Sequence, residues 1–565
     1  MRRISSSFKL RSILREEFHG YNRQSFQRDL LAGITVAAVA LPLALAFGVA
    51  SGASAAAGLV TAIIAGFVIG GLGGTAFQVS GPTGAMSAVL IVLASRYGLQ
   101  GMWMAAVMAG IAIFLLGVFN LGQIVNFIPS AVIAGFTSGI AVVIFIGQID
   151  NLLGVKTAAA DSTFVKLIQY FRFDYVPNLA AVGLSLLVIL IMVLWPKRLN
   201  ARFPGSLLAL MVATGIAVLF NLNVPIIGTI PQTILLDQRL TISQIPWSHL
   251  GELVTPALSI AALGAIESLL CGTAAGRMVD QKMESGQELI AQGFGNIILP
   301  FFGGVPATAA IARTSVAIKS GSLTRVTSLI HSVALLLVVL VLAPIISRVP
   351  MAVLGGVLAV TTWRMNEWSE IREIFGRHFK SAMFAFASTL IATVVLDLTQ
   401  AIIIGVGFSA LIFVFQISRT SVDLVPVSVE KMRAEGYDMQ YDADRIIVAY
   451  IVGPLFFGTV STFNLAMEKL NGMQDVILSL RTVPLLDTTG ISALEDLIER
   501  LEGSGSRVYL SGLNEPVNSY LRRAGVIQHL SEDRIFWSSF EAIMAADHYR
   551  AQVTPHPVTP KLAAI

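Results

Sequence analysis

Features that would indicate an enzyme or a metalloprotein are missing from this sequence of 565 residues. Its single cysteine, Cys271, excludes an internal disulfide and a cysteine-based metal site. The seven histidines do not cluster, and there is no glycine-rich phosphate loop with a lysine and no nucleophile elbow. We therefore expect a protein that is not an enzyme and has no resident cofactor or metal.

Charge is scarce as well. Asp, Glu, Lys and Arg make up 13% of the residues and hydrophobic residues 55%, whereas soluble domains are about 25% charged. The net charge of +4 is too small to favour nucleic acid as a partner. Residues 1–28 lack an apolar core followed by a cleavage site, so we expect a cytoplasmic arm and not a signal peptide.

Long uncharged apolar runs extend from about Leu30 to Ile417, which predicts an α-helical polytopic membrane protein. Glycine, proline and charge divide them into fourteen segments: 30–50, 55–74, 82–95, 101–121, 129–148, 178–196, 204–222, 251–275, 287–302, 306–319, 324–346, 350–364, 381–397 and 399–418. The expected divisions of the chain are an arm (1–28), a transmembrane domain (29–420), a linker (421–434), a soluble domain (435–546) and a disordered tail (547–565).

The basic residues indicate the orientation of these segments. Those of the arm and of the connections on the same side are Arg2, Arg3, Lys9, Arg11, Arg15, Arg23, Arg28, Lys197, Arg198, Arg202, Arg277, Lys282, Lys319, Arg372, Arg377 and Lys380. Short connections on the other side are nearly free of Lys and Arg, and Arg348 is the exception. By the positive-inside rule, both termini are expected in the cytoplasm and the protein in the inner (plasma) membrane of the cell.

The stretch 303–320, GGVPATAAIARTSVAIKS, interrupts an apolar region with two glycines and a proline. We expect a helix to restart with Pro306 in its first turn, where a missing N–H costs nothing. From Pro306 to Ile318 it would cover roughly 20 Å, whereas the hydrocarbon core is about 30 Å thick. The N–H groups and the positive dipole end of such a half-helix would face an anionic substrate inside the membrane.

A second stretch, residues 80–84 with the sequence SGPTG, has the same pattern, and Pro82 and Thr83 mirror Pro306 and Thr308. The short segments that follow are the third and the tenth, which are equivalent positions if the chain consists of two sets of seven. Seven plus seven segments of opposite orientation form an inverted repeat, which supplies the two conformations of alternating access. The alternative is that both segments are kinked but otherwise ordinary spanning helices.

Two ionisable residues lie inside these apolar segments. Glu267 must be protonated, paired or bound to a cation, because an ionised carboxylate is costly at membrane depth. It is either a coupling site for a proton or Na⁺, or a structural carboxylate. Arg313, expected about two turns below the start of its half-helix, would add positive field to an anion pocket, pair with Glu267, or extend to the membrane surface.

Strand and helix patterns alternate after Arg419, which predicts a small α/β domain. Strands are expected at 445–452, 475–480 and 508–511, and helices at 461–470, 491–501 and 516–524. The sequence LLDTTG places Asp487 at a helix start, followed by Thr488 and Thr489. These hydroxyls either accept a regulatory phosphate or lie in a plainly capped helix.

Several motifs, in this order along the chain, resemble the SulP anion transporters and their C-terminal STAS domain. They are VALPLALAFGVASG, VSGPTGAMSA, LGAIESLLCG, AQGFGNI, GGVPATAAIARTSVAIKSG, VGPLFFGT and LDTTG. The likeness covers residues 22–545. The second half of this region most resembles bacterial aerobic C4-dicarboxylate transporters, and there is a smaller resemblance to cyanobacterial Na⁺-dependent bicarbonate transporters.

The resemblance implies a core domain (segments 1–4 and 8–11) that moves against a gate domain (segments 5–7 and 12–14), and a homodimer formed through the membrane and STAS domains. It places the anion site on Phe47, Ser80, Thr83, Gly84, Ala310, Ile311, Ala312 and Arg313, and the coupling acid on Glu267. Departures from the bicarbonate group, Glu267 in place of Asp and Cys271 and Ile311 in place of Thr, favour a proton over Na⁺.

We therefore expect a secondary transporter of a small oxyanion, sulfate or a C4-dicarboxylate, that works as a proton symporter by an elevator motion. The first alternative is a sodium-coupled bicarbonate transporter. Alternatives of other classes are an anion channel and a membrane-anchored signalling protein whose STAS domain is the output.

Overall fold

Two compact units, residues 1–409 and 410–565, make up the computed structural model, and each is described by itself. The structure describes residues 9–122, 128–157, 163–172, 175–196, 199, 203–244, 247, 250–396, 398–418, 420–440, 443–470 and 475–553. Residues 1–8 of the expected arm and most of the expected tail, residues 554–565, lie outside the described part.

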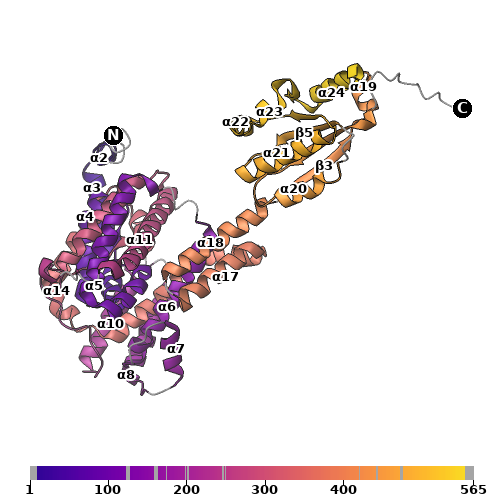
Figure 1. Cartoon of the computed structure of the whole chain (residues 1–565). Helices are drawn as coiled ribbons and strands as arrows, with labels where there is room; N and C mark the ends of the chain where they lie inside the picture. The colour runs from indigo at the N-terminus through magenta and orange to yellow at the C-terminus, as the bar shows by residue number, and fades with distance from the viewer. Residues whose placement is uncertain are drawn as a thin grey trace. The chain divides into compact units, whose positions relative to one another are not determined.

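The apolar runs up to residue 417 fold into helices, because a helix satisfies its own backbone N–H and C=O groups where no water is present (Figure 1). The helices are α2 (Leu10–Glu17), α3 (Arg23–Ala50), α4 (Ala55–Leu72), α5 (Gly84–Val118), α6 (Ser130–Leu153), α7 (Thr163–Phe171), α8 (Leu179–Leu194), α10 (Gly205–Leu219), α11 (Leu250–Val279), α12 (Ser285–Ile298), α13 (Ile311–Lys319), α14 (Val326–Ile346), α15 (Met351–Met365), α16 (Trp368–Gly376), α17 (Lys380–Val395) and α18 (Leu398–Ile417).

Six of the described helices are long and apolar enough to cross a membrane: α3, α4, α5, α6, α11 and α14. Shorter apolar helices accompany them, among them α8, α10, α15 and α17. The third and fourth expected segments are joined in α5, but Gly98 breaks the helix with φ 67° and ψ −179°. The prediction of an α-helical polytopic membrane protein is confirmed.

The helices pack in two groups. In one group α5 packs along α11 and α12, and α14 packs along α3 and α4. In the other group α6 packs on α15 and α17, and α8 on α10 and α15. The first group contains segments 1–4, 8, 9 and 11 of the expected core domain, and the second contains segments 5–7, 12 and 13 of the expected gate domain.

Small residues allow the helices of the core group to approach closely. A Cβ on Gly58 of α4 would lie 1.9 Å from the carbonyl oxygen of Ala44 on α3. Gly110 of α5 and Gly293 of α12 face each other's backbone in the same way. Contacts of this kind replace the hydrophobic driving force, which is absent between helices in lipid.

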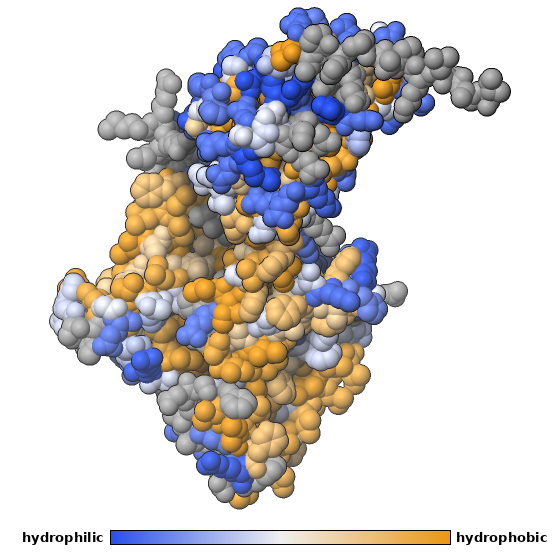
Figure 2. Space-filling view, turned by 45° about the vertical axis from the view of Figure 1, so that its right-hand side comes forward, coloured by the Kyte–Doolittle hydropathy of each residue, from blue (hydrophilic) through white to orange (hydrophobic). Residues whose placement is uncertain are grey.

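On the face shown in Figure 2, most of the surface of the first unit is apolar, whereas hydrophilic side chains gather on the second unit. Exposed large side chains of the first unit include Leu186, Val193, Leu219, Val341 and Trp363. An apolar surface of this extent indicates contact with lipid.

Helix α3 begins within the expected N-terminal arm. α3 begins at Arg23, because the side chain of Asn22 accepts hydrogen bonds from the N–H groups of Gln24 and Ser25 and so caps a helix start there. Residues 23–29 ahead of the apolar run, six polar residues and Phe26, are therefore helical. α3 thus begins six residues before the predicted start of the transmembrane domain at residue 29.

The second unit contains a sheet in the order β3–β4–β5–β6–β7. Its strands are β3 (Ser421–Pro426), β4 (Ile446–Val452), β5 (Asp475–Thr482), β6 (Val508–Ser511) and β7 (Ile535–Phe536), and its helices are α19 (Val429–Ala434), α20 (Val460–Met467), α21 (Thr488–Gly503), α22 (Glu515–Ala524), α23 (Val526–Leu530) and α24 (Ser539–Val553). β3 is antiparallel to β4, and the other pairs are parallel. The predicted α/β domain is confirmed.

Two predicted boundaries of this unit need correction. Residues 421–434, expected to be a linker, form β3 and α19, because the side chains of Val422 and Leu424 pack on the core of the domain. Residues 547–553, expected to be disordered, continue α24. Asp547 is buried there and accepts hydrogen bonds from the hydroxyl of Tyr437 and the backbone of Gln440.

Candidate functional site

Two short extended segments meet where the predicted half-helices begin. β1 (Ser80–Gly81) pairs antiparallel with β2 (Thr308–Ala309). Since β1 leads into α5 and β2 into α13, the two helices begin at opposite ends of this pair. Both N-termini therefore lie beside the crossing, in the interior of the core group. The alternative of two ordinary kinked spanning helices does not describe this arrangement.

α13 begins later than predicted. Pro306 precedes β2, and α13 comprises only the nine residues from Ile311 to Lys319. The expected helical start at Pro306 is wrong, because the fixed φ of proline also suits an extended segment and this one pairs with β1. Arg313 accordingly lies in the first turn of α13, and not two turns below the start.

The beginning of α13 leaves N–H groups for a ligand. Ala310 caps the helix without a side-chain hydrogen bond. Within the described residues, the backbone N–H groups of Ile311 and Ala312 have no acceptor, and both residues are exposed. A helix start with unpaired N–H groups and a positive dipole end is suited to binding an anion.

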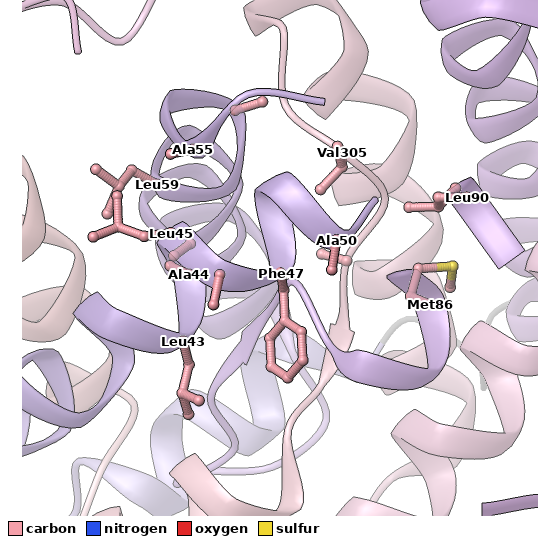
Figure 3. Packing of buried hydrophobic residues seen from close by; sticks show 14 of the residues in the cluster. Leu43, Ala44, Leu45, Phe47, Ala50, Ala55, Leu59, Met86, Leu90 and Val305 are labelled. Carbon is pink, nitrogen blue, oxygen red and sulfur yellow. The ribbon is translucent and has the colours of Figure 1, made fainter. Parts of the chain in front are cut away.

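Phe47 of α3 covers the beginning of α5. A Cβ on Gly84 would lie 3.2 Å from Cε1 of Phe47 and 2.8 Å from Cδ1 of Ile144 on α6. Phe47 is buried, and its ring projects from α3 into the space beside Met86 of α5 (Figure 3). The helix start therefore has an aromatic wall from the core group and an aliphatic one from the gate group.

Glu267 of α11 joins the two extended segments. Its Oε2 lies 2.9 Å from the hydroxyl of Thr83 and 2.5 Å from that of Thr308, and the two hydroxyls lie 3.0 Å apart. Three oxygens thus form a triangle with three hydrogen-bonding contacts. Two hydroxyls supply only two hydrogens. All three contacts are hydrogen bonds only when Glu267 carries a proton on Oε2.

Arg313 is buried without a carboxylate partner. Its Nη2 donates to the carbonyl oxygen of Pro82 at 2.9 Å, whereas Nη1 has no partner among the described residues. No ion pair joins it to Glu267, although the structure describes both residues. The predicted alternatives of pairing with Glu267 and of extending to the surface are therefore wrong, and an uncompensated positive charge stays beside the crossing.

A model of the sulfate permease family matches residues 26–411, and a STAS-domain model matches residues 440–542. The chain belongs to the sulfate permease (SulP) family. Its members are transporters and not enzymes.

This SulP protein is similar to a named relative and to two proteins of solved structure. YvdB of Bacillus subtilis (strain 168), provisionally named a sulfate transporter, is 35% identical over 92% of this chain and 97% of its own length. The solved transmembrane domain of a cyanobacterium bicarbonate transporter, BicA, is 30% identical with a TM-score of 0.62, covering 68% of this chain and 98% of that one. The murine anion transporter Slc26a9 shares the fold, with a TM-score of 0.83 over 96% and 94% of the chains at 20% identity.

The residues proposed for the SulP site are only partly brought together. Thr83, Gly84, Ala310 and Ile311 lie at the two helix starts, as expected. Ser80 instead accepts a hydrogen bond at 2.9 Å from Gln292 of α12, which directs its hydroxyl to the scaffold behind β1.

Thr308 is the residue that sequence reasoning did not include among the site residues. Its hydroxyl is buried and contacts both Glu267 and Thr83. The available signal was its position two residues after Pro306, which mirrors the proline–threonine pair at the other half-helix. Only the antiparallel pairing of β1 and β2 brings the two threonines together.

An open cavity of about 650 Å³ lies between α11 and α6 of the SulP core and gate groups. It is lined by Leu270, three residues after Glu267 on α11, and by Ile133 of α6. Arg277, Lys282 and Asp280 also line it, so its charged side chains leave a net positive charge that would attract an anion.

In the STAS domain, Asp487 caps α21. Its carboxylate accepts hydrogen bonds from the N–H of Gly490 at 2.8 Å and from the N–H of Phe457 at 3.1 Å. Thr488 and Thr489 follow in the first turn and are exposed. The capping role is present in the structure, and regulation by phosphate at either threonine stays a prediction.

Proposed function

We propose that this SulP protein is a secondary transporter that moves a small oxyanion, sulfate in the first place, together with a proton. Two observations together carry the proposal. The carboxyl group of Glu267 contacts two threonine hydroxyls, and Arg313 is buried without a carboxylate partner among the described residues. Glu267 can hold a proton, and Arg313 carries a positive charge that an anion can balance.

The need for an anion follows from Arg313. A buried charge is stable when it is paired, and truncation of one partner of such a pair is strongly destabilising. Arg313 has no carboxylate partner among the described residues. An oxyanion held by the first N–H groups of α13 would balance this charge and the helix dipole together.

The need for a proton follows from Glu267. When the carboxyl is protonated, the oxygen triangle with Thr83 and Thr308 is complete and neutral. When it is ionised, one contact loses its hydrogen and a negative charge lies beside the anion. Protonation therefore favours the loaded site, and the core group would carry anion and proton past the gate group as one body.

The names of relatives supply the substrate class. Sulfate is the substrate named for YvdB and for the matched family, and bicarbonate for BicA. Succinate or fumarate stays a prediction from the motif likeness alone. The homodimer and the plasma-membrane location with both termini in the cytoplasm also remain proposals.

Counterflow in proteoliposomes tests the proposal. The full-length protein is loaded with unlabelled anion and offered labelled sulfate, succinate, fumarate or bicarbonate, at pH 6 and pH 8, with and without Na⁺. We expect saturable sulfate uptake that is faster at the lower pH and indifferent to Na⁺. Glu267→Gln should abolish uptake driven by a pH gradient and preserve counterflow, which no longer depends on pH.

Glu252→Gln, an exposed carboxylate in the first turn of the same helix, is the matched control and should behave like the wild type. Uptake that requires Na⁺ and prefers bicarbonate would support the second candidate, which the 30% identity to BicA favours. Unitary currents that persist in the Glu267→Gln variant would show that the protein is an anion channel and not a transporter.

A further inference from the structure

A groove of about 760 Å³ lies between the core and gate groups on the apolar surface of the first unit. It is lined by α3 and α14 of the core and by α10 of the gate, and almost all of its lining side chains are aliphatic. Ile34, Met211, Leu342 and Ile345 line it and are themselves exposed. A surface hollow of this composition is suited to an acyl chain.

The groove is long enough to hold an acyl chain. Along α14 its lining extends from Ala334 to Ile346, which is about 18 Å at 1.5 Å per residue. Half of the hydrocarbon core is about 15 Å. α14 begins beside Arg325, where the N-terminal arm is attached through Glu17, so the end of the groove at Arg348 lies at the other end of α14 from the arm.

Arg348 stands at the end of this groove. It is the basic residue that departs from the charge bias of the connections, and it lines the groove just beyond the end of α14. Its side chain is exposed and makes no hydrogen bond or ion pair within the described part of the chain. A cation at the end of an apolar groove matches the form of an anionic phospholipid.

We propose that the groove between α3, α10 and α14 binds one anionic phospholipid, whose acyl chain occupies the groove and whose phosphate meets Arg348. The lipid would touch the core group through Leu41 and Leu342 and the gate group through Met211. Because it fills the space between the two groups, its presence would bias their relative movement. This site is separate from the oxyanion site at α5 and α13.

The test uses the purified full-length protein in vesicles of phosphatidylcholine and phosphatidylglycerol (3:1), with a diazirine on the acyl chain of either lipid. Labelled peptides are mapped by mass spectrometry. We expect phosphatidylglycerol to label α10 and α14 at the groove preferentially. Arg348→Gln should lower this labelling about fivefold, the effect of one basic residue on an anionic lipid, and remove the preference over phosphatidylcholine.

Two glycines provide matched variants for the acyl chain. A Cβ on Gly215 of α10, in the groove, or on Gly183 of α8, outside it, would meet no atom within 4 Å. Gly215→Trp should fill the groove and abolish labelling there by both lipids, whereas Gly183→Trp should leave it unchanged. Unchanged thermal melting of all three variants shows that they fold.

Three results would overturn the proposal. One is labelling spread evenly over the exposed helices, and another is labelling that does not respond to Arg348→Gln. The third is crosslinking of the groove to a second copy of the chain, which would make it a protein interface. None of these outcomes depends on transport, so failure here leaves the proposed function untouched.

Discussion

Gly81 has no room for a side chain, because the guanidinium of Arg313 lies against it. A Cβ at this position would lie 2.1 Å from Nη1. Gly81→Ala is therefore expected to displace Arg313, at a cost of about 1–3 kcal/mol for overpacking. A lower melting temperature in detergent and reduced sulfate counterflow should follow. Gly147→Ala on α6, where a Cβ meets nothing within 4 Å, should change neither, and equal behaviour of the two variants would contradict the packing argument.

The threonine hydroxyls beside Glu267 have a testable role. Thr308→Val removes one hydroxyl of the triangle and leaves the carboxyl short of a partner, at a cost of about 1–3 kcal/mol. We expect uptake to fall at least about fivefold and to lose its pH dependence, whereas Thr308→Ser should retain both. Thr361→Val of α15, whose hydroxyl donates only to its own helix, controls for loss of a hydroxyl. Wild-type pH dependence in Thr308→Val would exclude a shared proton.

At the scale of the element, the attachment of the N-terminal arm rests on an ion pair of α2. Glu17 accepts hydrogen bonds from the backbone N–H and Nε of Arg325, and both side chains are under 5% exposed. Glu17→Gln should leave a buried, uncompensated arginine and cost about 3–5 kcal/mol. Lys9→Gln breaks the exposed pair with Glu284 and should cost about 0–1 kcal/mol. A larger loss of thermal stability in Lys9→Gln than in Glu17→Gln would contradict this prediction.

The membrane helices were predictable because each is an uncharged run that must satisfy its own backbone. The start of α13 was not, since proline at 306 suits a helix start and an extended segment equally well. Nor could spacing along the chain predict that Thr83 and Thr308 meet, because their contact depends on two strands of two residues each. α2 went unnoticed because it is polar and its stabilising partner, Arg325, is over 300 residues away.

For the whole molecule, the decisive difference from expectation is where the second unit begins. Residues 421–434 look like a linker because β3 is short and half-exposed. Yet β3 pairs with β4 over six residues and brings Val422 and Leu424 onto the core that contains Leu478 and Leu494. The domain model matched only from residue 440, so neither sequence pattern nor family match marks this edge strand.

This difference predicts how the isolated domain behaves. A fragment of residues 420–553 should unfold cooperatively, because it contains the complete five-stranded sheet and both clusters of buried side chains that cover it. A fragment of residues 435–553 lacks β3, which leaves β4 as an unpaired edge and uncovers apolar side chains beneath it. We expect it to melt at a lower temperature and to aggregate, as followed by circular dichroism and light scattering. Identical melting temperatures of the two fragments would show that β3 does not stabilise the domain and is only a linker.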